Sequence, residues 1–68
     1  MLHRTISMEC GVRQLAQARE AVGSLQGVIA AEMIVGRNAI RVWQGEELSE
    51  SALRAAVKSC GVSSMKID

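Results

Sequence analysis

The spacing of apolar residues in this chain alternates between two periods, and this restricts its possible folds more than any other feature of the sequence. A period of two residues is typical of a half-buried strand, whereas a spacing of three and four residues is typical of an amphipathic helix. The segments follow one another as strand, helix, strand, strand, helix, strand. No proline or low-complexity tract interrupts them, so the chain is predicted to form one domain over residues 1–68.

The first half of the chain predicts a strand, a helix and a hairpin. Apolar residues recur at helical spacing after residue 10, and Gly27 ends that segment. The turn signal Gly-Arg-Asn at 36–38 separates two strand-like runs, as expected for a β-hairpin. The predicted elements are a strand over Leu2–Ser7, a helix over 11–25 that buries Leu15, Ala18, Val22 and Leu25, and strands over Val28–Val35 and Ala39–Trp43.

The second half predicts a helix and a closing strand. The polar run at 44–47 is expected to end the preceding strand, and Ser49 is a suitable helix N-cap. Leu48 and Leu53 have the spacing of a hydrophobic staple. The predicted buried face of this helix comprises Leu53, Ala56, Val57 and Cys60, Gly61 ends the helix, and the last strand spans Val62–Ile67.

This order of elements predicts an α+β, ferredoxin-like βαββαβ fold. A four-stranded antiparallel sheet would carry two helices on one face. Trp43 is the only aromatic residue, so the core must consist of aliphatic side chains, methionine and alanine. Such side chains suit close packing of helices on a sheet.

Cys10 lies where the first predicted strand gives way to the first helix. A thiol there is close to unpaired backbone N–H groups and to the positive end of the helix dipole, which favour the thiolate. Thiolates bind soft metal ions. Two-coordinate capture normally uses a second sulfur three residues later, and here that residue is Arg13. Met8 is expected to pack in the core, and His3 to lie on the surface at the remote end of its strand.

The motifs resemble those of the heavy-metal-associated (HMA) domain family. This family includes copper chaperones, N-terminal modules of metal-transporting P-type ATPases and mercuric-ion binding proteins. Its signature is Gly-Met-x-Cys-x-x-Cys after the first strand, then Gly-Val, then Ile-x-x-Ala-Ile-x-x-x-Gly-Tyr in the second helix. Three landmarks match in order, namely Met8-Glu9-Cys10, Gly27-Val28 and Leu53-x-x-Ala56-Val57-x-x-x-Gly61-Val62.

The resemblance implies a copper-chaperone-like domain with a degenerate metal motif. Ser7 stands in place of the family's glycine, Arg13 in place of its second cysteine, and Val62 in place of its aromatic residue. In the family, the loop after the second helix can complete or modulate the metal site. The resemblance therefore makes Cys60 a candidate ligand beside Cys10.

Two alternatives for the second ligand stay open. The position of Cys60 on an apolar helix face favours its being a small buried hydrophobic residue instead of a ligand. In that case two Cys10 loops could share one ion across the two-fold axis of a homodimer. Arg13 would oppose a bare cation, but it would favour the anionic complex of Cu(I) with two thiolates.

Composition excludes several functional classes. A formal net charge of +1 provides no basic surface for nucleic acid, and no stretch approaches the roughly 18 apolar residues of a membrane span. We recognise no signal peptide, and two distant cysteines favour a reducing compartment, so a cytoplasmic location is expected. One histidine, no paired carboxylates at a plausible pocket and no phosphate-binding glycine loop argue against an enzyme.

The first functional hypothesis is a small metal-binding or metallochaperone-like domain for a soft thiophilic ion, with Cu(I) preferred. It would pass the ion to a metal-transporting ATPase or another metal-handling protein. The alternative is a degenerate domain that no longer binds metal and acts as a protein-interaction or regulatory module. A third hypothesis, a disulfide between Cys10 and Cys60, requires Cα atoms within about 7 Å.

Overall fold

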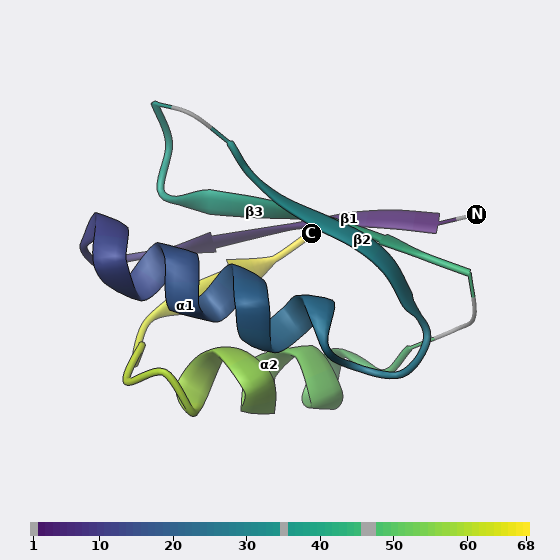
Figure 1. Ribbon diagram of the computed structural model, residues 1–68. Helices are drawn as coiled ribbons and strands as arrows, with labels where there is room; N and C mark the ends of the chain where they lie inside the picture. Colours follow the sequence, from purple (N-terminus) through teal and green to yellow (C-terminus); the bar gives the residue numbers. More distant parts are fainter. Residues whose placement is uncertain (1, 35, 46–47) are drawn as a thin grey trace.

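The computed structural model describes residues 2–34, 36–45 and 48–68. Its six elements follow in the predicted order (Figure 1). They are β1 (Leu2–Met8), α1 (Val12–Gly23), β2 (Val28–Ile34), β3 (Ala39–Gln44), α2 (Glu50–Lys58) and β4 (Met65–Ile67). The α+β, ferredoxin-like βαββαβ fold predicted from the sequence is therefore confirmed.

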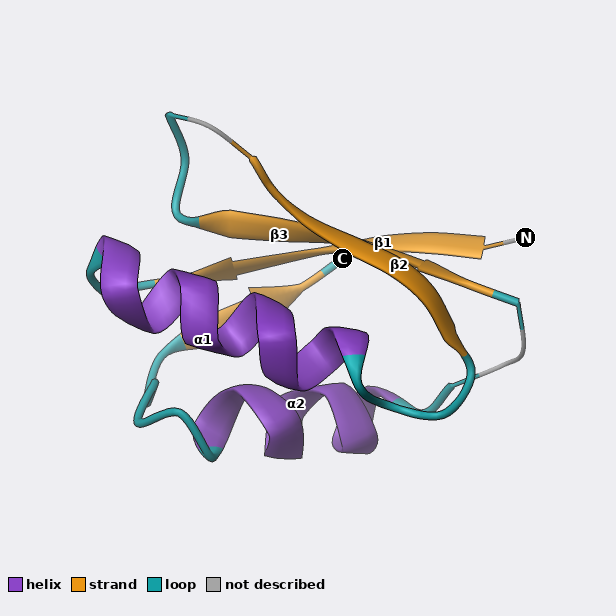
Figure 2. Ribbon diagram, in the orientation of Figure 1, coloured by secondary structure: helices purple, strands orange, loops and turns teal. Residues whose placement is uncertain are grey.

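The four strands form one antiparallel sheet in the order β2-β3-β1-β4. Both helices lie on the same side of this sheet and leave its other side open (Figure 2). β2 and β4 are the two edge strands. None of the helices that the structure describes is long and apolar enough to span a membrane.

The core lies between the sheet and the two helices. Alternation along β1 and β3 directs Ile6 and Ile40 inward as cross-strand partners, and the apolar stripes of both helices pack onto them. The predicted inward face of α1 is confirmed for its three buried residues. The core comprises Ile6, Met8, Leu15, Ala18, Val22, Ile40, Val42, Leu53, Val57 and Val62.

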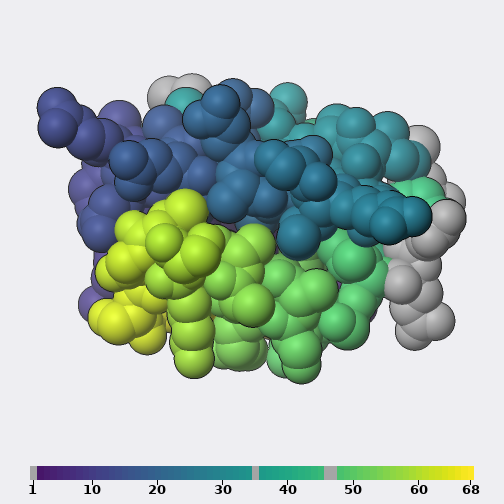
Figure 3. All heavy atoms as spheres, turned by 60° about the horizontal axis from the view of Figure 1, so that its bottom comes forward, coloured from purple at the N-terminus to yellow at the C-terminus, as the bar shows by residue number. Residues whose placement is uncertain are grey.

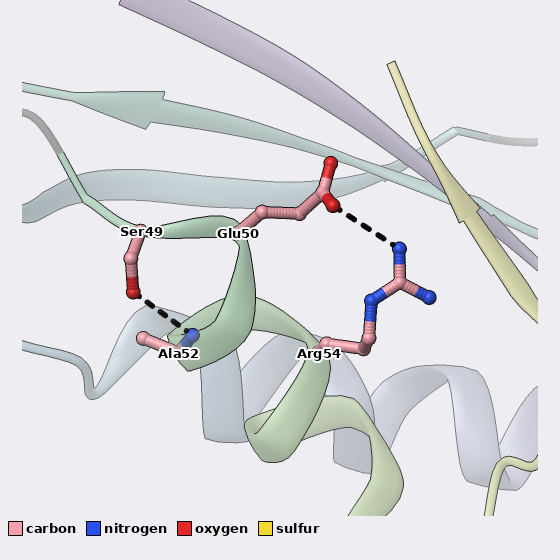
Figure 4. Close-up of polar contacts among 4 residues, drawn as sticks. All are labelled: Ser49, Glu50, Ala52 and Arg54. Carbon is pink, nitrogen blue, oxygen red and sulfur yellow. Dashed lines mark hydrogen bonds and ion pairs between the residues drawn. The ribbon is translucent and has the colours of Figure 1, made fainter.

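The two helices begin differently. In α2, the Ser49 hydroxyl accepts a hydrogen bond from the Ala52 N–H at 3.2 Å, as predicted for an N-cap (Figure 4). Glu50, the next residue, forms an exposed ion pair at 3.3 Å with Arg54, which lies one turn further on (Figure 4). The N-cap of α1 is Gly11, which has no side chain to accept such a bond. The first turn of α1 therefore lacks the side-chain cap that α2 has.

Several predicted boundaries were wrong. The last strand was expected from residue 62, but β4 begins at Met65 because Val62 is buried in the core while the chain returns to the sheet. The polar run at 44–47 was expected to end β3, yet Gln44 belongs to the strand and is buried. The first helix is also shorter than predicted at both ends. Val35, Glu46 and Glu47 lie outside the described residues.

Candidate functional site

Three connections meet at one end of the molecule. Because β1 is antiparallel to both β3 and β4, the loop after β1 lies beside the β2–β3 turn and the loop that precedes β4 (Figure 1). The Met8 N–H donates to the Asn38 carbonyl at 2.8 Å, and the Glu9 N–H donates to the Ser64 carbonyl at 3.1 Å. We call this region, formed by residues 9–11, 36–38 and 59–64, the cysteine end, since it contains both cysteines.

Cys10 occupies the loop between β1 and α1. The residue is half-buried, and it packs against the edge of the hydrophobic core. Burial raises the pKa of the Cys10 thiol above its ordinary value. This direction is opposite to the one expected from the helix terminus, and its cause is desolvation of the charged form.

Cys60 lies in the turn that follows α2. Its N–H donates to the Val57 carbonyl at 3.1 Å, and its thiol donates to the Ala56 carbonyl at 3.7 Å. The residue is half-buried and packs against the core, and both cysteines are free thiols. Cys60 thus has a local acceptor for its S–H group. The residue lies in a turn and not on the regular helix that the sequence predicted.

The loops that carry the two cysteines adjoin, as the sequence predicted. The Glu9–Ser64 hydrogen bond joins the Cys10 loop to the segment before β4. Gly61, directly after Cys60, lies against the side chain of Gln14 in the first turn of α1. Figure 3 shows the segment after α2, in yellow-green, in contact with the first part of α1, in blue. Whether Cys10 and Cys60 are the metal ligands stays a prediction.

The other candidate residues are distributed as follows. Arg13 is exposed in the first turn of α1, one turn after Cys10. Met8 is buried in the core, as predicted, and His3 is exposed at the other end of β1, where it lies opposite Trp43. Within residues 2–34, 36–45 and 48–68, no three His, Cys, Asp or Glu side chains form a cluster suited to a metal ion.

An apolar groove at the cysteine end was not predicted from the sequence. The groove has a volume of about 320 Å³ and separates the start of α1 from the end of β2. Val12 and Met33 are exposed at its margin. The signal that could have revealed it is Val12, which continues the apolar spacing of Leu15, Ala18 and Val22 but lies exposed at the first residue of the helix. The groove is lined by Val12, Leu15, Met33, Ile34, Gly36, Arg37 and Asn38.

Comparison with known proteins identifies the fold. No protein family matches the sequence, and no curated protein matches it either. Among solved structures, the yeast copper transporter domain Ccc2a, studied in the apo and Cu(I)-loaded states, aligns with a TM-score of 0.80 at 13% identity over 97% of this chain and 93% of that chain. The N-terminal domain of ZntA in the apo form aligns with a TM-score of 0.76 at 14% identity over 97% and 90%.

A third structural likeness is a complex. The Atx1–Cu(I)–Ccc2a complex contains a chain that aligns with a TM-score of 0.72 at 15% identity, over 96% of this chain and 92% of that one. Identities this low reflect shared architecture and carry no assignment of ligands. The chain therefore shares the fold of these domains.

Proposed function

We propose that this domain binds a soft monovalent metal ion, with Cu(I) preferred, at the cysteine end. The observation that supports this most is that the two free thiols belong to adjoining loops, which the Glu9–Ser64 hydrogen bond joins. Sulfur ligands select soft ions such as Cu(I) over Mg²⁺ or Ca²⁺. The likeness in fold to a copper transporter domain agrees with this chemistry.

In the proposed site, Cys10 supplies the first thiolate and Cys60 the second. Each thiol must lose its proton, and Cys60 must also give up its bond to the Ala56 carbonyl. The ion and two thiolates together carry a net negative charge. The exposed guanidinium of Arg13 then stabilises the loaded site, although it disfavours a bare cation.

Competition with a colorimetric Cu(I) chelator under reducing conditions tests the site. The wild type should remove one ion per chain from the chelator, and Cys10→Ser should abolish this uptake. Cys60→Ser should weaken uptake if the second thiolate comes from the same chain. If Cys60→Ser keeps its affinity and native mass spectrometry finds two chains per ion, two Cys10 loops share the metal.

Arg13→Cys is the matched positive control, because it restores the spacing of two cysteines three residues apart. If this variant takes copper while the wild type leaves the chelator complex unchanged, the metal-binding proposal is wrong. The second candidate, an interaction or regulatory module that has lost metal binding, would then be favoured. The presence of Arg13 where a ligand is expected is the observation behind this alternative.

The proposed cellular role follows from the exposed position of the loops. A metal-transporting ATPase, or another metal-handling protein of the cytoplasm, would approach the cysteine end and take the ion by thiolate exchange. Exchange of this kind needs the donor sulfur to be reachable, and Cys10 is partly exposed. The test is transfer of Cu(I) from the loaded domain to an acceptor with two cysteines, compared between wild type and Cys60→Ser.

A further inference from the structure

The free edge of β2 has the features of a strand-pairing surface. β2 is seven residues long, and no strand among the described residues pairs beyond it. Ile29 and Met33 are 58% and 38% exposed. Edge strands are commonly protected by charged side chains, proline or short length; β2 has no proline, is not short, and carries one charged residue, Glu32. A bulge between Val28 and Ala30 distorts only its beginning.

The direction of the backbone groups along β2 follows from the sheet register. Met8 N–H donates to Asn38 O, which marks a hydrogen-bonded pair between β1 and the chain entering β3. Since such pairs alternate along antiparallel strands, Ile40 and Val42 direct their backbone groups toward β1. Their partners on β2, Met33 and Ala31, must then direct N–H and C=O away from the sheet.

A side-chain contact supports this assignment independently. The guanidinium of Arg19 donates to the Ala31 carbonyl at 3.4 Å. Arg19 belongs to α1, and the C-terminal residue of α1, Gly23, also approaches Ala31 closely. α1 therefore passes beside Ala31, and the Arg19 side chain reaches the β2 edge there. Among the described residues, Arg19 is the one side chain that bonds to this edge.

The space outside the β2 edge differs at Met33 and at Ala31, the two residues whose backbone groups point away from the sheet. Beside Met33 it opens into the apolar groove, whose margin is formed by the 75% exposed Val12. Beside Ala31 it is occupied by the Arg19 guanidinium. A strand added at this edge would place its side chains opposite Met33 and Ala31 on the helix side of the sheet, because paired residues share a face. An apolar side chain fits the first position and a carboxylate the second.

We propose that the β2 edge binds an extended segment of a partner protein that pairs antiparallel with Ala31 and Met33. The segment reads, from its N-terminus, apolar residue, any residue, acidic residue. The apolar side chain covers Val12 and Met33 at the groove. The carboxylate takes the Arg19 guanidinium from the Ala31 carbonyl, which frees that carbonyl to accept a backbone hydrogen bond.

Charge argues against a second copy of the chain as the occupant. An antiparallel β2–β2 pair centred on Ala31 would place two Arg19 guanidinium groups at the two-fold axis. A pair centred on Glu32 would set two carboxylates directly opposite, which is destabilising. A pair centred on Met33 would use only the last three residues of the strand. An acidic segment of another protein would avoid both the repulsion between like charges and the short length of pairing.

Titration of the reduced, metal-free domain with synthetic strand peptides, followed by amide NMR, tests the proposal. The probe peptide carries leucine, threonine and glutamate in that order within a threonine- and valine-rich strand. Binding should slow hydrogen exchange at the Ala31 and Met33 amides. The glutamate peptide should bind about threefold more tightly than its glutamine analogue. Arg19→Gln should remove the preference for the glutamate peptide over the glutamine peptide. A variant that only weakened binding in general would keep this preference.

Two controls make the result decisive. Ala31→Pro removes an outward N–H without breaking a bond to β3, so a folded Ala31→Pro domain should lose peptide binding. The peptide with leucine and glutamate exchanged should bind more weakly. Equal binding by folded Ala31→Pro, tighter binding of the exchanged peptide, or dimerisation of the free domain through β2 would each overturn the proposal. Because no metal is present, these outcomes are separate from the copper experiments.

Discussion

The side chain of Gln14 lies against Gly61, so that a Cβ atom on Gly61 would come within 3.3 Å of Gln14 Nε2. Gly61 also has a φ of +86°, a backbone conformation that residues other than glycine rarely adopt. Both constraints act on the residue that follows Cys60. The turn that carries this thiol therefore lies close against the first turn of α1, and only glycine fits well at residue 61.

We predict that Gly61→Ala lowers the free energy of unfolding by about 1–2 kcal/mol, because alanine is strained at positive φ and crowds Gln14. Urea unfolding followed by far-ultraviolet circular dichroism measures this change. Gly23→Ala is the matched control: the new methyl group would meet Ala31 Cβ at an ordinary 3.9 Å, at the last residue of a helix. It should leave stability unchanged or raise it by up to about 1 kcal/mol. Equal losses in both variants would contradict the prediction.

Ser49→Ala should destabilise the domain by about 1 kcal/mol, because the Ala52 N–H loses its acceptor at the start of α2. The same unfolding assay applies. Glu50→Gln is the comparison within this turn, since the exposed Glu50–Arg54 pair should contribute at most about 0.5 kcal/mol. A larger loss in Glu50→Gln than in Ser49→Ala would mean that charge, and not capping, fixes this helix end.

The Cys10 thiol should titrate above the ordinary cysteine pKa of about 8.5, because burial disfavours the thiolate. In Cys60→Ser, which leaves Cys10 as the only thiol, the rate of alkylation by iodoacetamide against pH should have its midpoint above that value in the folded domain. In urea the midpoint should return to it. Because the pKa of Cys10 is raised on folding, the protonated thiol favours the folded state below the unfolded-state pKa. This contribution to stability is lost as the pH rises through the folded-state pKa. Cys10→Ser should therefore lose less stability than wild type in the alkaline range.

The pH dependence of copper affinity should report how many thiols bind the ion. Below the thiol pKa, each thiol that loses a proton on binding makes the apparent affinity rise about tenfold per pH unit. A site formed by Cys10 and Cys60 predicts about a hundredfold per unit, and Cys60→Ser predicts about tenfold. Chelator competition at several pH values provides both slopes. A tenfold slope in wild type with one chain per ion would exclude Cys60 as a thiolate ligand.

The fold could be predicted because each element has a local signal. The hydrophobic period identified the face of α1, Ser49 marked the start of α2, and Gly61 marked the turn after it. These features depend on residues close in sequence. The end of β3 could not be predicted in the same way, because Gln44 is polar and is nevertheless buried by residues distant in the chain.

The proximity of the two loops that carry the cysteines was predictable, but the environment of the Cys10 thiol was not. Antiparallel pairing of β1 with β4 was enough to bring the loops of Cys10 and Cys60 together. The pKa direction of Cys10 could not be inferred, because it depends on packing of its loop against the core, which the helix-terminus argument leaves out. The β2 edge escaped notice for a similar reason, since outward backbone direction is a property of the register and not of residue type.

Trp43 alternates with the inward residues of β3, so its ring stands on the helix-free side of the sheet, 6.0 Å from Arg41 Cζ. As the chain has no phenylalanine or tyrosine, its interior contains no chromophore that absorbs in the near ultraviolet. Intrinsic fluorescence will register events at the open sheet surface while the packing of the interior stays invisible to it. Methyl-group NMR is therefore the appropriate method for detecting a loosened interior in any variant of this domain.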